Sequence, residues 1–214
     1  MNARQLFMFL LHRDTTFKGE FRAMWRLIDP SAPKAIVDVG ANDGFYGSNS
    51  YPFVARGWRA LLIEPHPEAF ARLQRRHKKR RLATCLQIGC GDQDGELPLW
   101  TGPDGDTTLS SFTPGPIGHP TDAAARAIPI PVRRLDGVLA EQGFPETFAV
   151  LSVDAEGWDF AVLRGLDLAR WRPRMIVTEN MPGADASLKD EHLRQHGYHL
   201  RLMVDANALW TLPV

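Results

Sequence analysis

A glycine-rich loop directly after a short apolar run is the strongest constraint that this 214-residue chain places on its fold. Residues 35–44 read Ala-Ile-Val-Asp-Val-Gly-Ala-Asn-Asp-Gly, which predicts a short buried strand that runs into a tight turn. Gly40 and Gly44 allow the backbone to turn sharply and to approach a ligand closely. A second apolar run, residues 60–63, ends at Glu64, where nucleotide-binding α/β folds place an acid that takes ribose hydroxyls. Together the two features predict a site for a ribose-bearing cofactor.

Stretches with the periodicity of strands alternate with stretches of helical periodicity along most of the chain. One domain is expected over 31–214, after a helical segment at 1–30 that a proline-rich stretch ends. Strands are expected at 35–39, 60–63, 82–88, 95–100, 128–132, 148–153, 175–178, 198–204 and 208–212, and helices at 45–56, 67–78, 135–142, 159–165 and 188–196. This alternation predicts a doubly wound, largely parallel α/β sheet. The Gly-, Pro-, Ser- and Thr-rich residues 101–120 predict a long functional loop.

The charge balance argues against a polyanionic partner. Lys and Arg number 25 and Asp and Glu number 25, so no overall field favours nucleic acid or an anionic membrane. The basic run 75–81 reads as a solvated helix end, and a phosphate or nucleic-acid patch is the alternative. Cys85 and Cys90 have neither metal-site spacing nor a disulfide framework, and no apolar run approaches the roughly 20 residues that span a bilayer. We therefore expect a cytoplasmic protein without a membrane span.

The acids at the ends of the predicted strands narrow the choice of cofactor. They are Asp38, Glu64, Asp92, Asp154 and Glu179. The carboxyl ends of parallel strands lie at one edge of a sheet, where such folds bind ligands. An acidic rim suits S-adenosylmethionine, because its sulfonium is cationic and its amino groups and ribose hydroxyls seek acceptors. The dinucleotide pattern Gly-x-Gly-x-x-Gly is absent, since position 42 is Asn, and there is no Walker motif.

Several of these stretches resemble the FkbM family of methyltransferases. The resemblance covers most of the chain and rests on the motifs at 37–46 (Val-Asp-Val-Gly-Ala-Asn-Asp-Gly-Phe-Tyr), 63–67 (Ile-Glu-Pro-His-Pro), 91–95 (Gly-Asp-Gln-Asp-Gly), 151–157 (Leu-Ser-Val-Asp-Ala-Glu-Gly) and 163–165 (Leu-Arg-Gly). It implies a class I S-adenosylmethionine-dependent methyltransferase. That fold is a Rossmann-like, doubly wound sheet of seven mostly parallel strands with an antiparallel C-terminal strand. The resemblance also implies O-methylation of a sugar, a glycan or a natural product.

The resemblance implies roles for individual residues. Those expected beside the methionine half of the cofactor are Asp38, Gly40, Asn42 and Gly44. Glu64 is expected to hold the ribose and Asp92 to lie near the adenine. The expected cofactor-binding set is completed by Phe45, Pro65 and Asp154. The chain departs from the family pattern at His66, where Asn is usual, and at Ala155, where Val is usual, which leaves a catalytic role for His66 open.

Two routes to activation of the acceptor hydroxyl are consistent with the sequence. In one, a divalent cation such as Mg²⁺ binds the acceptor, in an arrangement that resembles catechol-type O-methyltransferases. Its expected ligands are Asp154, Glu179 and Asn180. In the other, a side chain removes the hydroxyl proton. The candidate bases are Asp154, Glu156, His66 and His119.

Several of these residues also have purely structural interpretations. Glu156 is equally suited to accept from backbone amides at the start of the next helix. Trp158 is placed either to stack on a sugar ring or to pack in the core. Ser110 and Ser111 either contact a ligand or form an ordinary turn.

Two other functions stay open at this stage. One is a nucleic-acid methyltransferase that uses the 75–81 run, and the other is a cofactor-binding protein without catalysis. The expected partner is a small-molecule or glycan acceptor and no nucleic acid. The sequence also allows a homo-oligomer.

Overall fold

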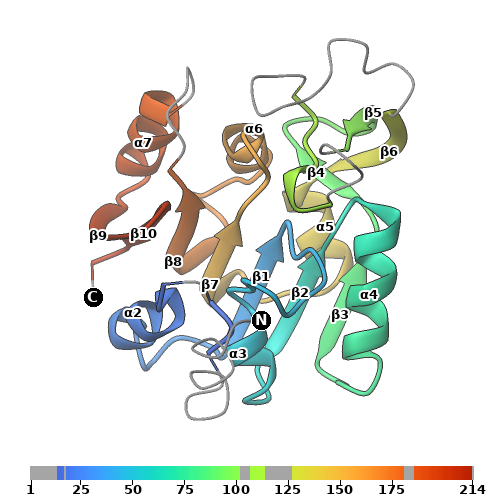
Figure 1. The fold of residues 1–214 in the computed structure, drawn as a ribbon. Coiled ribbons are helices and arrows are strands. Elements are labelled where there is room, and N and C mark those ends of the chain that lie inside the picture. Colours follow the sequence, from blue (N-terminus) through green and yellow to red (C-terminus); the bar gives the residue numbers. More distant parts are fainter. Residues whose placement is uncertain (1–13, 17, 102–106, 114–126, 181–185, 214) are drawn as a thin grey trace.

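A single mixed sheet forms the centre of the computed structural model, which describes residues 14–16, 18–101, 107–113, 127–180 and 186–213 (Figure 1). Seven strands of this part of the chain lie in the order β3-β2-β1-β7-β8-β10-β9. They are β1 (Ala35–Val39), β2 (Arg59–Ile63), β3 (Ala83–Leu86), β7 (Thr147–Val153), β8 (Arg172–Glu179), β9 (His199–Val204) and β10 (Asn207–Thr211). β10 pairs antiparallel with both β8 and β9, whereas the pairs from β3 across to β8 are parallel. The predicted mostly parallel sheet with an antiparallel C-terminal strand is confirmed.

Helices cover both faces of this sheet. They are α2 (Glu20–Leu27), α3 (Tyr51–Val54), α4 (Pro67–His77), α5 (Leu135–Glu141), α6 (Asp159–Arg164) and α7 (Ala186–Gln195). Successive side chains of a strand point to opposite faces. Accordingly Ile36 of β1 packs in one cluster with Phe53 of α3 and Leu73 of α4. Its neighbour Val37 packs in the other cluster with Leu163 of α6, so the core has the two layers of a doubly wound fold.

A second, smaller sheet holds residues that the sequence places in the main one. Its three strands lie in the order β4-β6-β5, with β4 (Gly89–Gly91), β5 (Gly95–Trp100) and β6 (Ala127–Arg134). The strand expected at 82–88 therefore ends at Leu86, and the chain then leaves the main sheet. Small residues allow this departure, because a Cβ on Gly165 would overlap the carbonyl of Gly91. The expected rim of five strand-end acids is corrected to four in the main sheet, since Asp92 follows β4.

The helix expected at 45–56 is reduced to its last turn, α3. The preceding residues form a loop in which Asp43 Oδ1 accepts hydrogen bonds from the backbone N–H groups of Phe45 (2.8 Å) and Tyr46 (2.9 Å). Gly47 has a φ of 70°, which a right-handed helix does not allow. The loop thus returns the chain to the sheet without a long helix.

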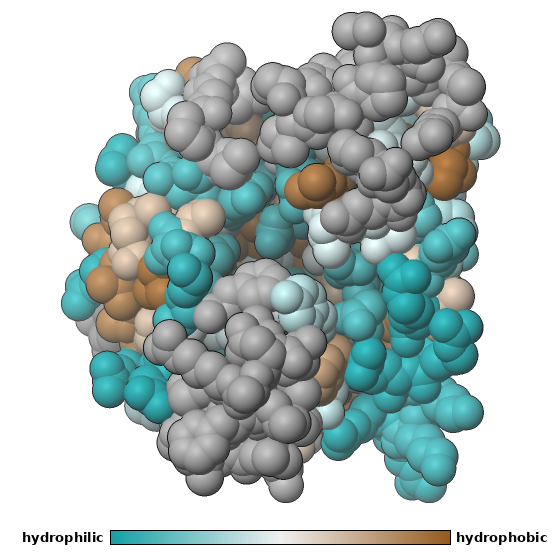
Figure 2. All heavy atoms as spheres, in the orientation of Figure 1, coloured by the Kyte–Doolittle hydropathy of each residue, from teal (hydrophilic) through white to brown (hydrophobic). Residues whose placement is uncertain are grey.

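The outer surface differs between the two ends of the sheet. The side of the molecule that carries α4 is largely hydrophilic, whereas apolar side chains gather over β9 at the opposite edge (Figure 2). Leu200, Leu202 and Met203 of β9 are all exposed. A sheet edge with apolar side chains is a place where a second chain can pair, and the homo-oligomer stays a prediction. No helix in the described ranges is long and apolar enough to cross a membrane.

Candidate functional site

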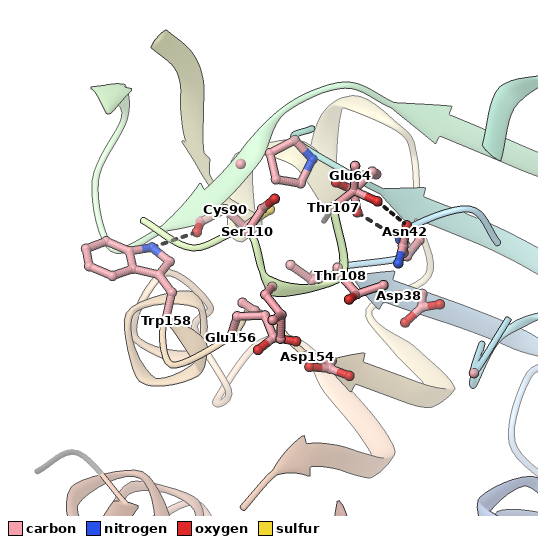
Figure 3. Close-up of a pocket in the computed structure, with 18 of the residues that line it drawn as sticks. Asp38, Asn42, Glu64, Cys90, Thr107, Thr108, Ser110, Asp154, Glu156 and Trp158 are labelled. Carbon is pink, nitrogen blue, oxygen red and sulfur yellow. Dashed lines mark hydrogen bonds between the residues drawn. The ribbon is translucent and has the colours of Figure 1, made fainter. Parts of the chain in front are cut away.

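A cavity of about 300 Å³ lies at the carboxyl ends of β1, β2 and β7. The loops after these strands and the start of β4 line it, and residues 107–112 lie across it (Figure 3). This is the edge at which the sequence places a ligand site. Glu64 and Asn42 lie on one side of the cavity, and Asp154 and Glu156 lie on another (Figure 3).

The backbones of two loops touch at Gly40. This glycine has a φ of 87°, and a Cβ at its position would overlap the carbonyl oxygen of Asp154. The N–H groups of Gly40 and Ala41 both donate to the carbonyl of Ile63 at 3.0 Å, and the Asp154 N–H donates to the carbonyl of Val39 at 2.9 Å. The loops after β1, β2 and β7 are therefore joined through main-chain contacts that only glycine permits at position 40.

Asp38 supplies a buried carboxylate on the floor of the cavity. It lies within β1, is 3 % exposed, and accepts a hydrogen bond from the hydroxyl of Ser50. Burial raises the pKa of Asp38, while hydrogen bonds from Ser50 and Ser152 oppose that rise. Hydroxyl groups therefore orient the Asp38 carboxyl. Hydrogen bonds, rather than the charge of a basic side chain, oppose the rise in its pKa.

Glu64 is held by backbone donors on both of its oxygens. Its Oε2 accepts from the N–H of Asn42 and its Oε1 from the N–H of His66, each at 2.8 Å. Burial raises the pKa of Glu64 to about 7 in spite of these two donors. The carboxyl group is therefore fixed in orientation at the cavity wall, which is what recognition of a diol requires.

A second group of acids lies across the sheet, after β7 and β8. One carboxylate oxygen from each of Asp154, Glu156 and Glu179 lies within 4.8 Å of the others. Burial raises the pKa of Asp154 well above its ordinary value, and the charges of Glu179, Asp159 and Glu156 add to the rise. Burial and the charge of Asp159 raise the pKa of Glu179 to about 7. Glu179 is therefore close to half-protonated at neutral pH, unlike an ordinary carboxylate.

Lys189 of α7 places a buried ammonium beside this acid group. Its side chain is 5 % exposed, and its Nζ donates to the backbone carbonyl of Glu179. Its charge lowers the pKa values of Asp159 and Glu179, against the larger effect of burial. Nothing in the sequence indicated this lysine, because its burial depends on how α7 packs against the end of β8.

Several residues expected in the site lie elsewhere. Gly44 faces Leu73 and His77 of α4, and Phe45 lies under the guanidinium of Arg76 at 4.6 Å. Neither Gly44 nor Phe45 lines the cavity. Gly44 serves the packing of the loop on α4, since a Cβ there would meet both α4 side chains.

Asp92 does not line the cavity either. It forms an ion pair with Arg164 of α6, because β4 belongs to the smaller sheet. The residues that precede Asp92 closely, Ile88 to Cys90, line the cavity instead. Cys90 is fully buried, and burial raises the pKa of its thiol to about 12, so it is an apolar wall residue rather than a nucleophile.

His66 caps a helix and has no place in the cavity lining. Its Nδ1 accepts from the N–H of Glu68 at 3.2 Å, at the first turn of α4, and Pro67 follows it. A capping residue followed by Pro at the first helical position is a signal that the sequence contained. His66 therefore has a structural contact at the start of α4, and the structure does not bring it to the cavity. His119 lies outside the described residues.

The expected metal ligands are brought together only in part. Asp154 and Glu179 are close, but Asn180 is exposed and its backbone N–H donates to the carbonyl of Ala206 at 2.6 Å. Glu156 takes the third place in the acid group. Asn180 directly follows Glu179, the last residue of β8, and successive side chains of a strand point to opposite faces.

Trp158 is fixed by packing and by a hydrogen bond. Its Nε1 donates to the carbonyl of Cys90 at 3.1 Å, and its ring lies 6.0 Å from that of Phe112. The indole is thus part of the cavity wall and ties the loop after β7 to β4. This favours the packing interpretation over a freely placed stacking surface.

Comparison with known proteins agrees with this architecture. A family model described as the methyltransferase FkbM domain matches residues 38–200. A curated protein from Beauveria bassiana (strain ARSEF 2860), named Methyltransferase 1, is 30% identical over 152 residues, which are 64% of this chain and 59% of the relative. The chain thus covers about three fifths of the length of this relative.

Solved structures share the fold at low sequence identity. A methyltransferase FkbM from Methylobacillus flagellatus KT superposes with a TM-score of 0.54 at 19% identity, over 83% of this chain and 43% of that one. The product of gene MT0146 of Methanobacterium thermoautotrophicum, described as precorrin 8W decarboxylase, gives a TM-score of 0.51 at 15% identity, over 94% and 92%. At these identities the two structures establish the fold alone.

Proposed function

Because the chain belongs to the FkbM methyltransferase family, we propose that it transfers a methyl group from S-adenosylmethionine to a hydroxyl of a sugar, glycan or natural-product acceptor. The observation that carries the proposal is Asp154 Oδ1. This atom is shielded from solvent, has no hydrogen-bond partner among the described residues, and belongs to a residue that lines the cavity. A buried acceptor without a donor is costly unless a ligand completes it.

The polar groups of the cavity suit the donor molecule. S-adenosylmethionine carries an amino group, ribose hydroxyls and a sulfonium, and Asp38 and Glu64 present carboxylate oxygens to one cavity. Glu64 would hold the ribose hydroxyls, and Asp38 and the Gly40 turn would lie beside the methionine half. When bound, S-adenosylmethionine supplies an electrophilic methyl carbon.

We assign activation of the acceptor to a general base among the acids after β7. A base works best when its pKa lies near the working pH. Asp154, with a raised pKa, and Glu156, in the same acid group, both line the cavity. Either carboxylate would take the proton of the acceptor hydroxyl as its oxygen bonds the methyl carbon and the C–S bond of the donor breaks, which leaves S-adenosylhomocysteine. The wall formed by Trp158 and Phe112 would limit access of water to that proton.

A route through a divalent cation is the second candidate. The oxygens of Asp154, Glu156 and Glu179 are the hard ligands that Mg²⁺ prefers, and their spacing supports one shared cation. A cation there would lower the pKa of the acceptor hydroxyl. Against this route, the ammonium of Lys189 already places a positive charge beside Glu179. We therefore favour the route in which a carboxylate acts as base without a metal.

The position of the basic run argues against a nucleic-acid acceptor. Residues 75–81 begin in the last turn of α4, whose 11 residues extend roughly 16 Å from the end nearest the cavity. Arg76 is engaged by Asp43 at 3.0 Å and lies over the Phe45 ring. The rest of the run lies between the end of α4 and the start of β3, which is parallel to β2, so it joins the sheet at the end opposite the cavity. The run would not guide a nucleic acid to Asp154.

Substitution of Asp154 tests the proposed function. In Asp154→Asn we expect turnover to fall by more than about 100-fold, because the base is lost. The affinity for S-adenosylhomocysteine should stay within about threefold of the wild type. Turnover is measured as S-adenosylhomocysteine release over a panel of sugar, glycoside and polyketide alcohols, and Asp205→Asn, in an exposed turn, is the control. An Asp154→Asn enzyme with wild-type turnover would remove Asp154 from the mechanism.

Metal removal separates the two routes. Full chelation should leave turnover unchanged if a carboxylate alone is the base. A loss of activity that added Mg²⁺ restores would establish the cation route in its place, with Glu156 in the position expected of Asn180.

A further inference from the structure

Two residues at the rim of the cavity have a left-handed backbone conformation, which is unfavourable for one of them. Asn42 has a φ of 46° and Glu156 a φ of 50°. In the described residues only one other non-glycine residue, Asp205 in the turn between β9 and β10, has a positive φ. Asn and Asp tolerate the left-handed region, but Glu seldom adopts it, so something must hold Glu156 there.

One short segment contacts both of these residues. At its start, Thr107 lies 3.4 Å from the side-chain oxygen of Asn42, measured from hydroxyl to amide oxygen. At its end, the hydroxyl of Ser111 donates to the backbone carbonyl of Glu156 at 2.7 Å. The segment 107–111 lies across the cavity between these two contacts (Figure 3). The segment is far from both residues in the sequence, so these contacts come from the tertiary fold.

Ser111 is firmly placed by its own surroundings. It is 3 % exposed, and its backbone forms a two-way bridge with Trp100, with both N–H···O distances at 2.9 Å. Its hydroxyl oxygen also accepts from the N–H of Thr113 at 3.1 Å. A hydroxyl has one proton. Because the Glu156 carbonyl can only accept, that proton lies on the Ser111–Glu156 bond, and a lone pair of Oγ accepts from Thr113.

We propose that Ser111 is a positioning residue that holds Glu156 in the left-handed conformation and so directs its carboxylate into the acid group with Asp154. The inference rests on the proposed function, in which Glu156 belongs to the proton-accepting acids. The Ser111 bond fixes the peptide plane that follows Glu156, and Gly157, with a φ of 86°, completes the turn. Without that bond, Glu156 relaxes toward the extended or right-handed region, and its side chain leaves Asp154 and Glu179.

The test is to remove only the hydroxyl and to read the backbone of Glu156 directly. In Ser111→Ala we expect the NMR shifts and backbone coupling of Glu156 to leave the left-handed range, whereas Ser111→Thr, which keeps the hydroxyl, retains them. Ser31→Ala, at an exposed serine before β1, is the control. A left-handed Glu156 in Ser111→Ala would overturn the proposal, as would a Ser111→Thr protein that shifts as Ser111→Ala does.

Binding of S-adenosylhomocysteine separates this proposal from the proposed function. Calorimetry on Ser111→Ala should give an affinity within about threefold of the wild type, because Ser111 touches no expected cofactor residue. With an accepted alcohol, turnover should fall about 10-fold while KM for the donor is retained. A Glu156 that shifts without any loss of turnover would uphold the positioning role and refute Glu156 as a base. If Ser111→Ala does not fold, Ser111→Cys is read in the same way, and failure of both would show that Ser111 serves only the fold.

Discussion

The two sides of the cavity hold their carboxylates in opposite ways. On the β1–β2 side, Asp38 accepts from Ser50, and both oxygens of Glu64 accept from backbone N–H groups. On the β7–β8 side, Asp154 Oδ1 and Glu179 Oε2 have no hydrogen-bond partner within the described part of the chain. The carboxylates of the first side are thus hydrogen-bonded within the protein, whereas two oxygens on the second side are left for a ligand to bond.

The electrostatic surroundings of the two sides differ as well. The pKa of Glu64 and that of Glu179 are both raised to about 7, chiefly by burial. At Glu64, hydrogen bonds from backbone N–H groups are the main effect that opposes the rise in pKa. At Glu179, the charge of Lys189 opposes it. Dipoles fixed in the main chain do not titrate, but neighbouring charges do. We therefore expect pH and substitution to alter the β7–β8 side more readily than the β1–β2 side.

The largest predicted effect breaks the contact that joins the two sides. Gly40→Ala places a Cβ against the Asp154 carbonyl at a positive φ, and should destabilise the fold by more than about 3 kcal/mol. The control is Gly57→Ala, which has a φ of 79° and open space around the new Cβ. It should cost about 1 kcal/mol. Thermal unfolding measures both, and equal losses in the two variants would mean that the contact at Gly40 does not matter.

A smaller effect is predicted for a substitution on the β1–β2 side. Glu64→Gln turns one acceptor into an NH₂ group that faces a backbone N–H. We expect the affinity for S-adenosylhomocysteine to fall by about 10- to 100-fold, as loss of a hydrogen bond to a charged group implies. Glu96→Gln, on exposed β5, should bind as the wild type does. An unchanged affinity in Glu64→Gln would place the ribose elsewhere.

The smallest predicted effect is a change in the pH dependence of stability. Glu179 has a folded-state pKa of about 7 against an ordinary value of 4.5, so the folded protein keeps its proton while the unfolded chain loses it. The contribution of Glu179 to stability is thus present below about pH 4.5 and is lost as pH rises through about 7. Glu179→Gln removes this loss. Because Glu179 is partly exposed, solvent screening reduces its contribution to about 1 kcal/mol. Relative to the wild type, the Tm of this variant should therefore rise by about 2–4 °C between pH 4.5 and 7.5, measured by calorimetry. A constant difference between the two Tm values would contradict the raised pKa.

The sequence predicted the β1–β2 side better than the β7–β8 side, for a physical reason. Gly40, Asn42 and Glu64 act through the strand and turn in which they occur, so local pattern places them. Lys189 reaches the site through the packing of α7 on β8, which no local pattern encodes. Asp92 was misplaced for the same reason, because pairing of β4 with β6 takes it out of the main sheet.

For His66 and Asn180, the sequence itself contained signals against the expected placement. His66 precedes a proline at the start of a helical stretch, which is the pattern of a helix cap. Asn180 follows Glu179 directly, and alternation along a strand separates their directions. Ser111 had no such signal, since its bond to Glu156 spans 45 residues.

The main-chain contact at Gly40 also means that side chains of the site can change while the spacing of its loops does not. Because the loops after β1, β2 and β7 are joined through backbone atoms, their spacing does not depend on which side chains the last of them carries. Under the proposed function, side chains on the acceptor side can therefore be changed while the donor side keeps its geometry. If the proposed function holds, the backbone fixes the site of the donor, whereas side chains alone shape the site of the acceptor.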